Sequence, residues 1–325
     1  MEEPLPVRTR ESGFAGDEAV RATNDDASGC KRFAVELGYW QDQFLPYFIR
    51  NLERKAPEIN RGYYARVRGL KLLIDQFIKT CQGNCQIVNL GAGFDTLYWK
   101  LCEEGQVILN FAELDFPAVT ARKSHLIQRS KRLLHYINKA DDEVKVNTNS
   151  LHAANYHIAA VDLRNTEEVA QKLAECNIKP EIPALFISEC VLVYMKPKES
   201  QALLEFIASR FTTAAFCNYE QVNMKDRFGE VMLTNLKMRG CDLAGVDLCQ
   251  DLKTQQQRLT QHGWEHAQAW NMSQVYYALP RNDVARIERL EFLDELELLE
   301  QLLQHYCICF AYKDPLKLGL NSISL

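Results

Sequence analysis

The hydrophobic positions of the chain fall into two patterns that follow one another from residue 87 onward. Short continuous apolar runs predict buried strands, and segments with an apolar residue every three or four positions predict amphipathic helices. The predicted strands cover residues 87–90, 110–116, 157–162, 183–189, 214–222, 265–272 and 307–313. Because helical segments alternate with these runs, the pattern predicts an α/β fold with a Rossmann-like, doubly wound sheet.

The helical pattern is strongest in two segments. The first, residues 57–80, carries on one face the apolar side chains Tyr63, Val67, Leu70, Ile74, Phe77 and Ile78. Arg66 falls at the edge of this face, so it either extends into solvent over its own aliphatic stem or holds a carboxylate at the rim of a pocket. The second, residues 283–306, has an apolar stripe beside a run of glutamates, which predicts one continuous helix with a solvated acidic face.

A glycine turn follows the first strand, within the stretch IVNLGAGFDT at 87–96. Gly91 and Gly93 lack a Cβ atom, which lets the backbone bend sharply and lets a ligand approach closely. Asp115 ends the next strand about twenty residues later, the spacing of a carboxylate that binds a ribose. The alternative is an ordinary strand-to-helix turn, because Thr96 stands where the dinucleotide fingerprint has its third glycine.

Two further strands end near carboxylates, Asp162 and Glu189. Ligands of open α/β sheets bind outside the carboxyl ends of the strands, so the strand ends together predict a nucleotide-type cofactor. A nicotinamide cofactor and S-adenosylmethionine are both compatible with a glycine turn and a ribose-binding acid. Asp162 with the backbone amide of Leu163 suits an adenine edge, and the missing third glycine favours a cofactor without phosphates.

Segments outside the strands differ in composition. The polar N-terminal residues predict an arm without fixed structure. The stretch of about forty residues after the fifth strand is too long for a simple connection, so we predict inserted helices that form a lid. The predicted organisation is an arm at 1–27 and one domain at 28–325, with a helical cap (28–86), cofactor-binding strands (87–218), the lid insertion (219–262) and the last strands and helix (263–325).

Composition excludes several kinds of partner. The 325 residues are 47% apolar with a net charge of −5, and no basic stretch predicts nucleic-acid binding. The chain has no apolar run of membrane-spanning length and a polar N-terminus, so we expect a cytoplasmic protein without a membrane segment, and a monomer. The eleven cysteines are irregularly spaced and mostly lie in apolar runs, which predicts free thiols and no metal site.

Seven segments resemble successive motifs of the leucine carboxyl methyltransferases, from about Cys30 to the end of the chain: CKRFAVELGYW, KAPEINRGYYARV, VNLGAGFDT, ELDFP, SECVLVYM, NYEQVNMKDRFG and ERLEFLDELELLEQL. The resemblance implies a class I methyltransferase fold with S-adenosylmethionine as the methyl donor. It implies that the acceptor is the C-terminal leucine α-carboxylate of the protein phosphatase 2A catalytic subunit, with a role in phosphatase regulation. It places Tyr194 near the acceptor and implies cofactor contacts at Lys31, Arg66, Gly91, Asp115, Asp162, Leu163 and Glu189.

The implied reaction agrees with the absence of a catalytic triad pattern from the sequence. A C-terminal carboxylate has a pKa of about 3.3 to 3.7 and is ionised at neutral pH, so its attack on a methyl group needs no general base. Lys31 and Arg66 would orient a carboxylate of the cofactor or of the substrate leucine. The alternatives are the tRNA-modifying branch of the family, whose β-propeller repeats this sequence lacks, an NAD-dependent oxidoreductase, and a non-catalytic scaffold.

Overall fold

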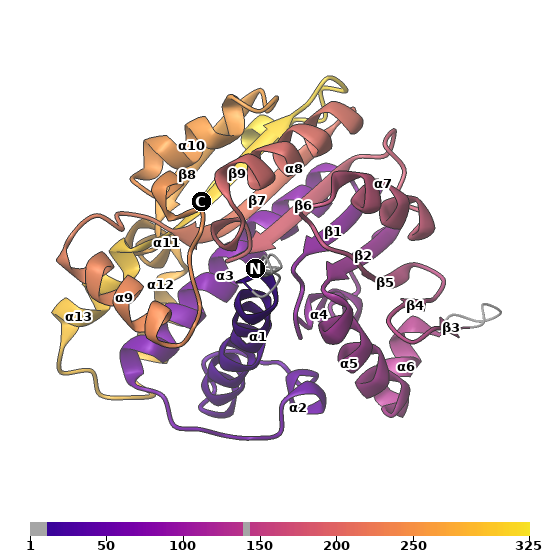
Figure 1. Cartoon of the computed structure of the whole chain (residues 1–325). Coiled ribbons are helices and arrows are strands. Elements are labelled where there is room, and N and C mark those ends of the chain that lie inside the picture. The colour runs from indigo at the N-terminus through magenta and orange to yellow at the C-terminus, as the bar shows by residue number, and fades with distance from the viewer. Residues whose placement is uncertain (1–11, 139–143) are drawn as a thin grey trace, which may run out of the picture.

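The computed structural model describes residues 12–138 and 144–325, and within them one central sheet has helices on both faces (Figure 1). The strand order is β3-β4-β5-β2-β1-β6-β7-β9-β8. The strands are β1 (Gln86–Leu90), β2 (Asn110–Asp115), β3 (Lys145–Val146), β4 (Leu151–His152), β5 (Tyr156–Ala160), β6 (Ala184–Glu189), β7 (Ala214–Gln221), β8 (His266–Asn271) and β9 (Tyr306–Lys313). Neighbouring strands among β5, β2, β1, β6 and β7 are parallel, which confirms the doubly wound sheet.

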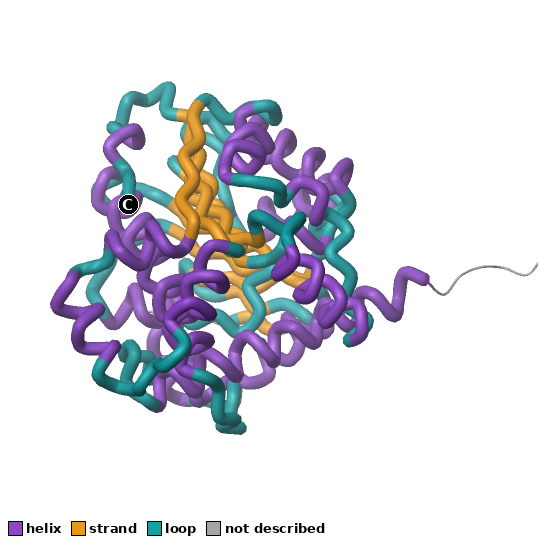
Figure 2. Tube along the Cα trace, turned by 90° about the vertical axis from the view of Figure 1, so that its left-hand side faces the viewer, coloured by secondary structure: helices purple, strands orange, loops and turns teal. Residues whose placement is uncertain are grey.

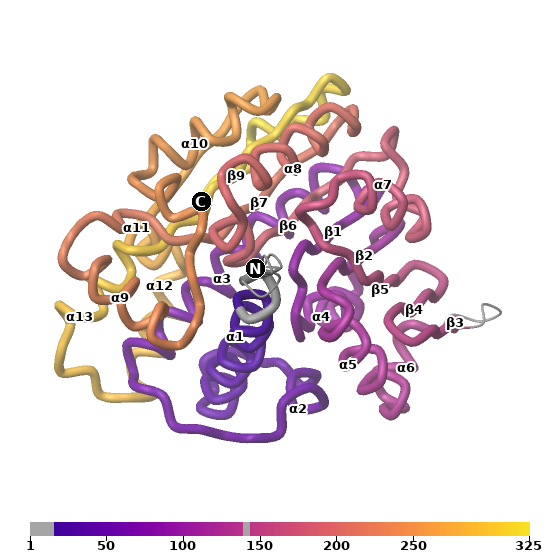
Figure 3. Tube along the Cα trace, in the orientation of Figure 1, coloured from indigo at the N-terminus to yellow at the C-terminus, as the bar shows by residue number. Residues whose placement is uncertain are grey.

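Antiparallel strands extend both edges of the parallel centre. β9 runs antiparallel between β7 and β8, while β3 and β4 form a short antiparallel extension next to β5. The sequence did not predict β3 and β4, because a strand of two residues is too short to show an alternation. β5, β2, β1, β6 and β7 lie side by side (Figure 3). Because they are parallel, all five end at the same edge of the sheet, the edge at which the sequence predicts a cofactor site.

Each face of the sheet packs against its own layer of helices. The helices are α1 (Ser12–Glu36), α2 (Leu45–Phe48), α3 (Pro57–Thr80), α4 (Leu97–Glu103), α5 (Pro117–Gln128), α6 (Lys131–Ile137), α7 (Thr166–Glu175), α8 (Pro197–Arg210), α9 (Arg227–Met238), α10 (Leu252–Thr260), α11 (Met272–Ala278), α12 (Arg281–Glu288) and α13 (Leu296–Gln304), with 3-10 turns η1 (Leu192–Tyr194), η2 (Val246–Leu248) and η3 (Leu320–Ser322). Ile87 of β1 joins the core that includes Phe77 of α3, whereas Val88 joins the core that includes Leu203 of α8. Helices lie on both sides of the strands (Figure 2). Successive side chains of a strand point to opposite faces, so a parallel strand covered on both sides is continuously apolar.

The N-terminal segment is helical where the structure describes it. α1 covers residues 12–27, so the prediction of an arm without fixed structure is wrong for them, and residues 1–11 lie outside the described residues. The polar side chains that suggested disorder have polar partners: Asp17, for example, forms an ion pair with Arg164. A segment that packs on the polar edge of a sheet needs few apolar residues, and its composition then resembles that of a disordered arm.

The prediction of one helix over residues 283–306 is also wrong, because the structure has α12 and α13 with a break between them. Glu291 lies in the break, where its carboxylate accepts hydrogen bonds from the Tyr39 hydroxyl at 2.9 Å and from Asn60 Nδ2 at 2.8 Å. Arg61 donates to the Glu291 backbone carbonyl at 3.1 Å. These long-range contacts outweigh the local helical preference of the segment.

The predicted insertion contains helices, α9 and α10, and its role as a lid stays a prediction. Contacts with η1 and with the sheet hold the base of the insertion. The backbone N–H of Gly245 donates to the Val193 carbonyl in η1 at 2.8 Å, and buried Arg258 of α10 forms an ion pair with buried Glu220 of β7 at 2.5 Å. The base of the insertion is therefore held against η1 and β7.

We predict acid sensitivity from a histidine pair on β4 and β5. The Nδ1 atoms of His152 and His157 lie 3.2 Å apart, and burial, followed by the charge on His152, lowers the pKa of His157 to about 4. The folded state therefore disfavours protonation of His157, while the unfolded state takes up the proton near pH 6.5. The contribution of His157 to the free energy of unfolding is fully present above pH 6.5. It is lost as the pH falls toward 4, by about 2 kcal/mol between pH 7.5 and pH 5. Urea unfolding at both pH values tests this, and His157→Gln should remove most of the pH-dependent loss; an unchanged loss in that variant would contradict the assignment.

Candidate active site

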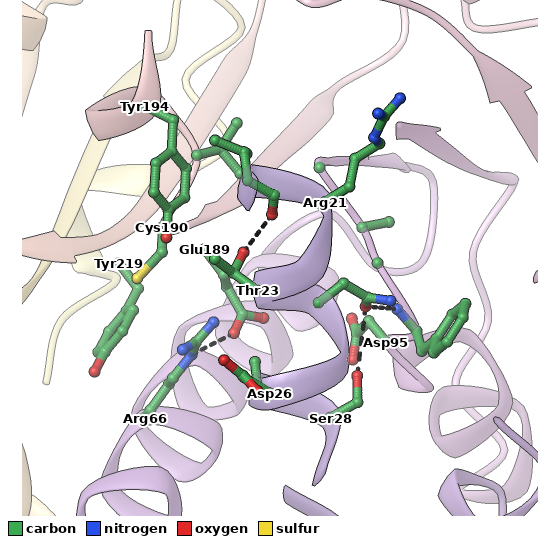
Figure 4. Close-up of a pocket in the computed structure, with 18 of the residues that line it drawn as sticks. Arg21, Thr23, Asp26, Ser28, Arg66, Asp95, Glu189, Cys190, Tyr194 and Tyr219 are labelled. Atoms are coloured by element: carbon green, nitrogen blue, oxygen red, sulfur yellow. Dashed lines mark hydrogen bonds and ion pairs between the residues drawn. The ribbon is translucent and has the colours of Figure 1, made fainter. Parts of the chain in front are cut away.

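A cavity of about 480 Å³ lies at the carboxyl ends of the parallel strands, between α1, α3 and the insertion (Figure 4). All nine site residues predicted from the sequence line this cavity. The residues at the ends of different strands therefore surround one cavity. The nine residues are Lys31, Arg66, Gly91, Gly93, Asp115, Asp162, Leu163, Glu189 and Tyr194. Whether each contacts a cofactor or substrate stays a prediction.

The glycine turn has the sharp backbone bend that the sequence predicts and a second cause that the sequence did not indicate. Gly91 and Gly93 have φ angles of +61° and +51°, the left-handed region that glycine adopts most readily. A Cβ atom at Gly91 would overlap the side chain of Val191, and one at Gly93 would overlap the amide oxygen of Asn24. The turn therefore needs glycine both for its backbone conformation, as predicted, and to leave space for these neighbouring side chains. Close approach of a ligand to the glycines stays a prediction.

Asp115 is held at the glycine turn by two backbone donors. The N–H groups of Gly93 and Phe116 each donate to its carboxylate at 2.7 Å. Burial raises the pKa of Asp115, and these two hydrogen bonds oppose the rise. A carboxylate has about four acceptor positions, so Asp115 can still accept hydroxyl groups from a ligand in the cavity.

Two cations and one anion form the charged end of the cavity. Arg66 Nε donates to Glu189 Oε2 at 2.7 Å, and Lys31 Nζ lies 3.4 Å from the same oxygen. Burial would raise the pKa of Glu189, but Lys31 and Arg66 hold it at about 2, so the carboxylate is ionised. The sequence left open whether Arg66 is solvated or holds a carboxylate; it is buried and holds that of Glu189. The cluster carries a net positive charge that can attract a further carboxylate.

Asp162 has a partner that the sequence did not indicate. Arg164 binds both carboxylate oxygens of Asp162, with Nε at 2.8 Å and Nη2 at 2.7 Å, and binds both oxygens of Asp17 in α1. Burial raises the pKa of Asp162, but the hydrogen bonds and charge of Arg164 outweigh it and lower the pKa. Reasoning from the sequence missed this pair because Asp17 lies in a segment interpreted as disordered. Leu163, between the two partners, is buried at the cavity wall.

A largely apolar and aromatic wall adjoins the charged end of the cavity. Tyr194 of η1 and Tyr219 of β7 lie on the same side as Glu189 in Figure 4. Tyr219 stacks on Tyr306 with 5.3 Å between ring centroids, and the Arg66 guanidinium lies 4.5 Å from the Tyr219 centroid. The remaining apolar wall comes from α3, α9 and α13 and includes Ile59, Met232, Leu236 and Leu302. The sequence does not indicate that Tyr219 and Tyr306 line the cavity, because a tyrosine within an apolar strand has the same pattern as a core residue.

Histidines lie outside the cavity, and potential metal ligands are not clustered among the described residues. All seven histidines belong to the described part of the chain, and none lines the cavity. Among residues 12–138 and 144–325, no three His, Cys, Asp or Glu side chains are grouped so that they could hold a metal ion. All eleven cysteines belong to the described residues, and no disulfide bond joins any two of them. None of the described helices is long and apolar enough to cross a bilayer.

Comparison with known proteins identifies the family. A model of the leucine carboxyl methyltransferase family matches residues 19–208. Leucine carboxyl methyltransferase 1 of Rattus norvegicus is 48% identical, with 98% of this chain and 100% of that protein covered, and the Bos taurus protein of the same name is 50% identical, with 95% and 94% covered. The tRNA wybutosine-synthesizing protein 4 of Homo sapiens is 32% identical over 90% of this chain, which spans 44% of that protein. This chain therefore belongs to the leucine carboxyl methyltransferase family, as a class I methyltransferase whose cofactor is S-adenosylmethionine.

Proposed function

We propose that this enzyme transfers a methyl group from S-adenosylmethionine to the α-carboxylate of the C-terminal leucine of the protein phosphatase 2A catalytic subunit, and so regulates assembly of the phosphatase holoenzyme. We further propose that it acts in the cytoplasm as a monomer. The observation that carries the proposal is a single cavity in which the charged cluster of Lys31, Arg66 and Glu189 adjoins an apolar wall. The charged cluster suits the zwitterionic methionine part of S-adenosylmethionine. The apolar wall beside it suits the side chain of a C-terminal leucine whose α-carboxylate lies near the cluster.

The polar groups match the parts of S-adenosylmethionine in spatial order. Asp162 and the backbone of Leu163 would bind the adenine, and Asp115 the ribose hydroxyls. The methionine end carries a carboxylate and an ammonium group, which suit the cations and the anion of the charged cluster respectively. This arrangement assigns cofactor contacts to the strand ends of β5, β2 and β6 in turn.

The apolar wall is where we place the acceptor. Met232, Leu236 and Leu302 can surround a leucine side chain, while Tyr194 lies near the charged cluster (Figure 4). Arg66, Lys31 and Tyr194 would then position the reacting carboxylate. A leucine side chain buried against such a wall contributes about 1.5–3 kcal/mol to binding, enough to favour it over a polar C-terminal residue.

The reaction needs alignment rather than proton transfer. A carboxylate oxygen attacks the methyl carbon, the carbon–sulfur bond breaks, and its electron pair stays on sulfur, which yields a methyl ester and S-adenosylhomocysteine. No proton moves in this step, in agreement with a cavity that no histidine lines. Correct alignment can supply about 7 to 11 kcal/mol. Because an anion and a cation neutralise each other, exclusion of water should favour the transfer.

The chemical stability of the product tests this function. The enzyme is incubated with methyl-labelled S-adenosylmethionine and either the phosphatase catalytic subunit or total tRNA. We expect label on the phosphatase that mild alkali releases as volatile methanol, the behaviour of a methyl ester. Label on tRNA alone, or alkali-stable label on the phosphatase, would contradict the proposal and, in the first case, favour the tRNA-modifying alternative.

A further inference from the structure

α1 crosses the carboxyl edge of the sheet and contacts three parts of the cofactor site at regular intervals. Asp17 binds Arg164 beside the end of β5, Asn24 accepts a hydrogen bond from the Phe94 amide in the glycine turn at 2.8 Å, and Lys31 pairs with Glu189 at the end of β6. Residues seven positions apart lie on one face of a helix, separated by about 10 Å along its axis. One face of α1 therefore extends from the adenine end of the site to its charged end.

α1 also reaches the insertion on the other side of the cavity. Asp26 lies 4.0 Å from Arg239 at the end of α9, and a Cβ atom at Gly240 would lie 3.8 Å from that of Ala19. In Figure 4, α1 passes between the wall that carries Tyr194 and the wall that carries Asp95. A cofactor bound to the strand ends would thus lie beneath α1.

The two halves of α1 are attached differently. The second half is anchored in the main hydrophobic core through Ala34, which is fully buried. The first half, residues 16–28, is attached chiefly by polar contacts, of which the Arg164 contact with Asp17 has both side chains about one-third exposed. Polar contacts at such exposure are weak and reversible, whereas separation of the buried half would expose apolar surface.

We propose that residues 16–28 form a strap that opens for cofactor exchange and that the ion pair between Asp17 and Arg164 is its latch. The proposal rests on the assignment of Asp162 to the adenine in the proposed function. Arg164 acts as a positioning residue: it fixes the Asp162 carboxylate on one side and retains the strap on the other. Breaking the latch therefore shortens the residence time of the cofactor without removing any group that we assign to the reaction.

Asp17→Ala, with Glu18→Ala as its matched control, tests the latch. Both variants remove one carboxylate from the same helix, but Glu18 is exposed and Asp17 faces Arg164. Hydrogen exchange of the backbone amides of residues 16–28 is measured without cofactor, and release of labelled S-adenosylmethionine is measured after a chase with unlabelled cofactor. Asp17→Ala should accelerate both exchange and release about fivefold, and Glu18→Ala should change each less than twofold. Asp17→Glu should restore slow exchange and slow release.

The two readouts separate failure of the latch from failure of the proposed function. Unchanged exchange in Asp17→Ala overturns the latch, whatever the cofactor does. Faster exchange with an unchanged release rate overturns the link between the strap and the cofactor. If the wild-type chain binds no S-adenosylmethionine, the assignment of the cavity to the cofactor fails, and so does the link between the strap and the cofactor. Accelerated hydrogen exchange in Asp17→Ala would still establish that the ion pair holds α1 closed.

Discussion

Arg66→Ala should reduce the affinity for S-adenosylmethionine and kcat/KM for methyl transfer by about a hundredfold, as expected for the loss of about 3 kcal/mol of charged hydrogen bonding in a buried site. Arg66 is buried, contacts Glu189 at 2.7 Å and lies against Tyr219. The substitution would leave Glu189 with only the longer Lys31 contact and would remove a group that orients carboxylates. Calorimetric titration and initial rates measure the two effects.

Two further variants make the Arg66 result interpretable. Arg68→Ala removes a guanidinium from the same helix, but Arg68 pairs with Asp283 at 3.6 Å and does not line the cavity, so its effect should stay within twofold. Arg66→Ala leaves the buried Glu189 carboxylate without its Arg66 partner, and adding Glu189→Gln removes that negative charge. The double variant should therefore fold as well as the wild type but should still bind S-adenosylmethionine weakly. Methyl transfer and cofactor affinity that both survive Arg66→Ala within a few-fold would show that the assignment is wrong.

Lys123→Met should lower the free energy of unfolding by about 3–5 kcal/mol, the range for leaving one member of a buried ion pair without its partner. Lys123 and Glu113 have side chains that are only 2% and 1% exposed, and their charged atoms lie 2.5 Å apart. Lys123 also donates to the Asp95 carbonyl beside the glycine turn at 2.8 Å. Urea unfolding with methyl transfer as a second readout should show lost stability and weakened cofactor binding.

The cost of the unpaired charge can be separated from the loss of packing. Lys123→Met combined with Glu113→Leu replaces both charges by apolar groups and should recover most of the lost stability. Lys172→Met, which removes the half-exposed pair with Glu175, should cost less than about 0.5 kcal/mol. A double variant no more stable than Lys123→Met alone would contradict the explanation.

Local patterns in the sequence predict the parts of the fold that depend on local rules. The parallel strands are recognisable because burial on both faces requires continuous apolar runs, and their ends must meet at one edge. For that reason Asp115, Asp162 and Glu189 could be placed around one cavity before the structure was known. The assignment to the family likewise agrees with the motifs quoted from the sequence.

The features that were missed depend on contacts between distant segments. The helix over 283–306 is broken because Tyr39 and Asn60 hold Glu291, and neither contact leaves a periodic signal. The sequence pattern predicts no fixed structure for residues 12–27 of α1, because Asp17 and its neighbours are polar. The ion pair with Arg164 in the structure explains why Asp17 is polar. The second reason for glycine at the turn was likewise not visible in the sequence, since it lies in the side chains of Val191 and Asn24, which come from other segments.

The central claim is that the acceptor is the terminal leucine carboxylate of the phosphatase catalytic subunit. Methyl transfer from labelled S-adenosylmethionine to the intact subunit, compared with transfer to a subunit that lacks only its last leucine, tests it most directly. We predict stoichiometric labelling of the intact subunit and background labelling of the shortened one. Equal labelling of the two would contradict the claim.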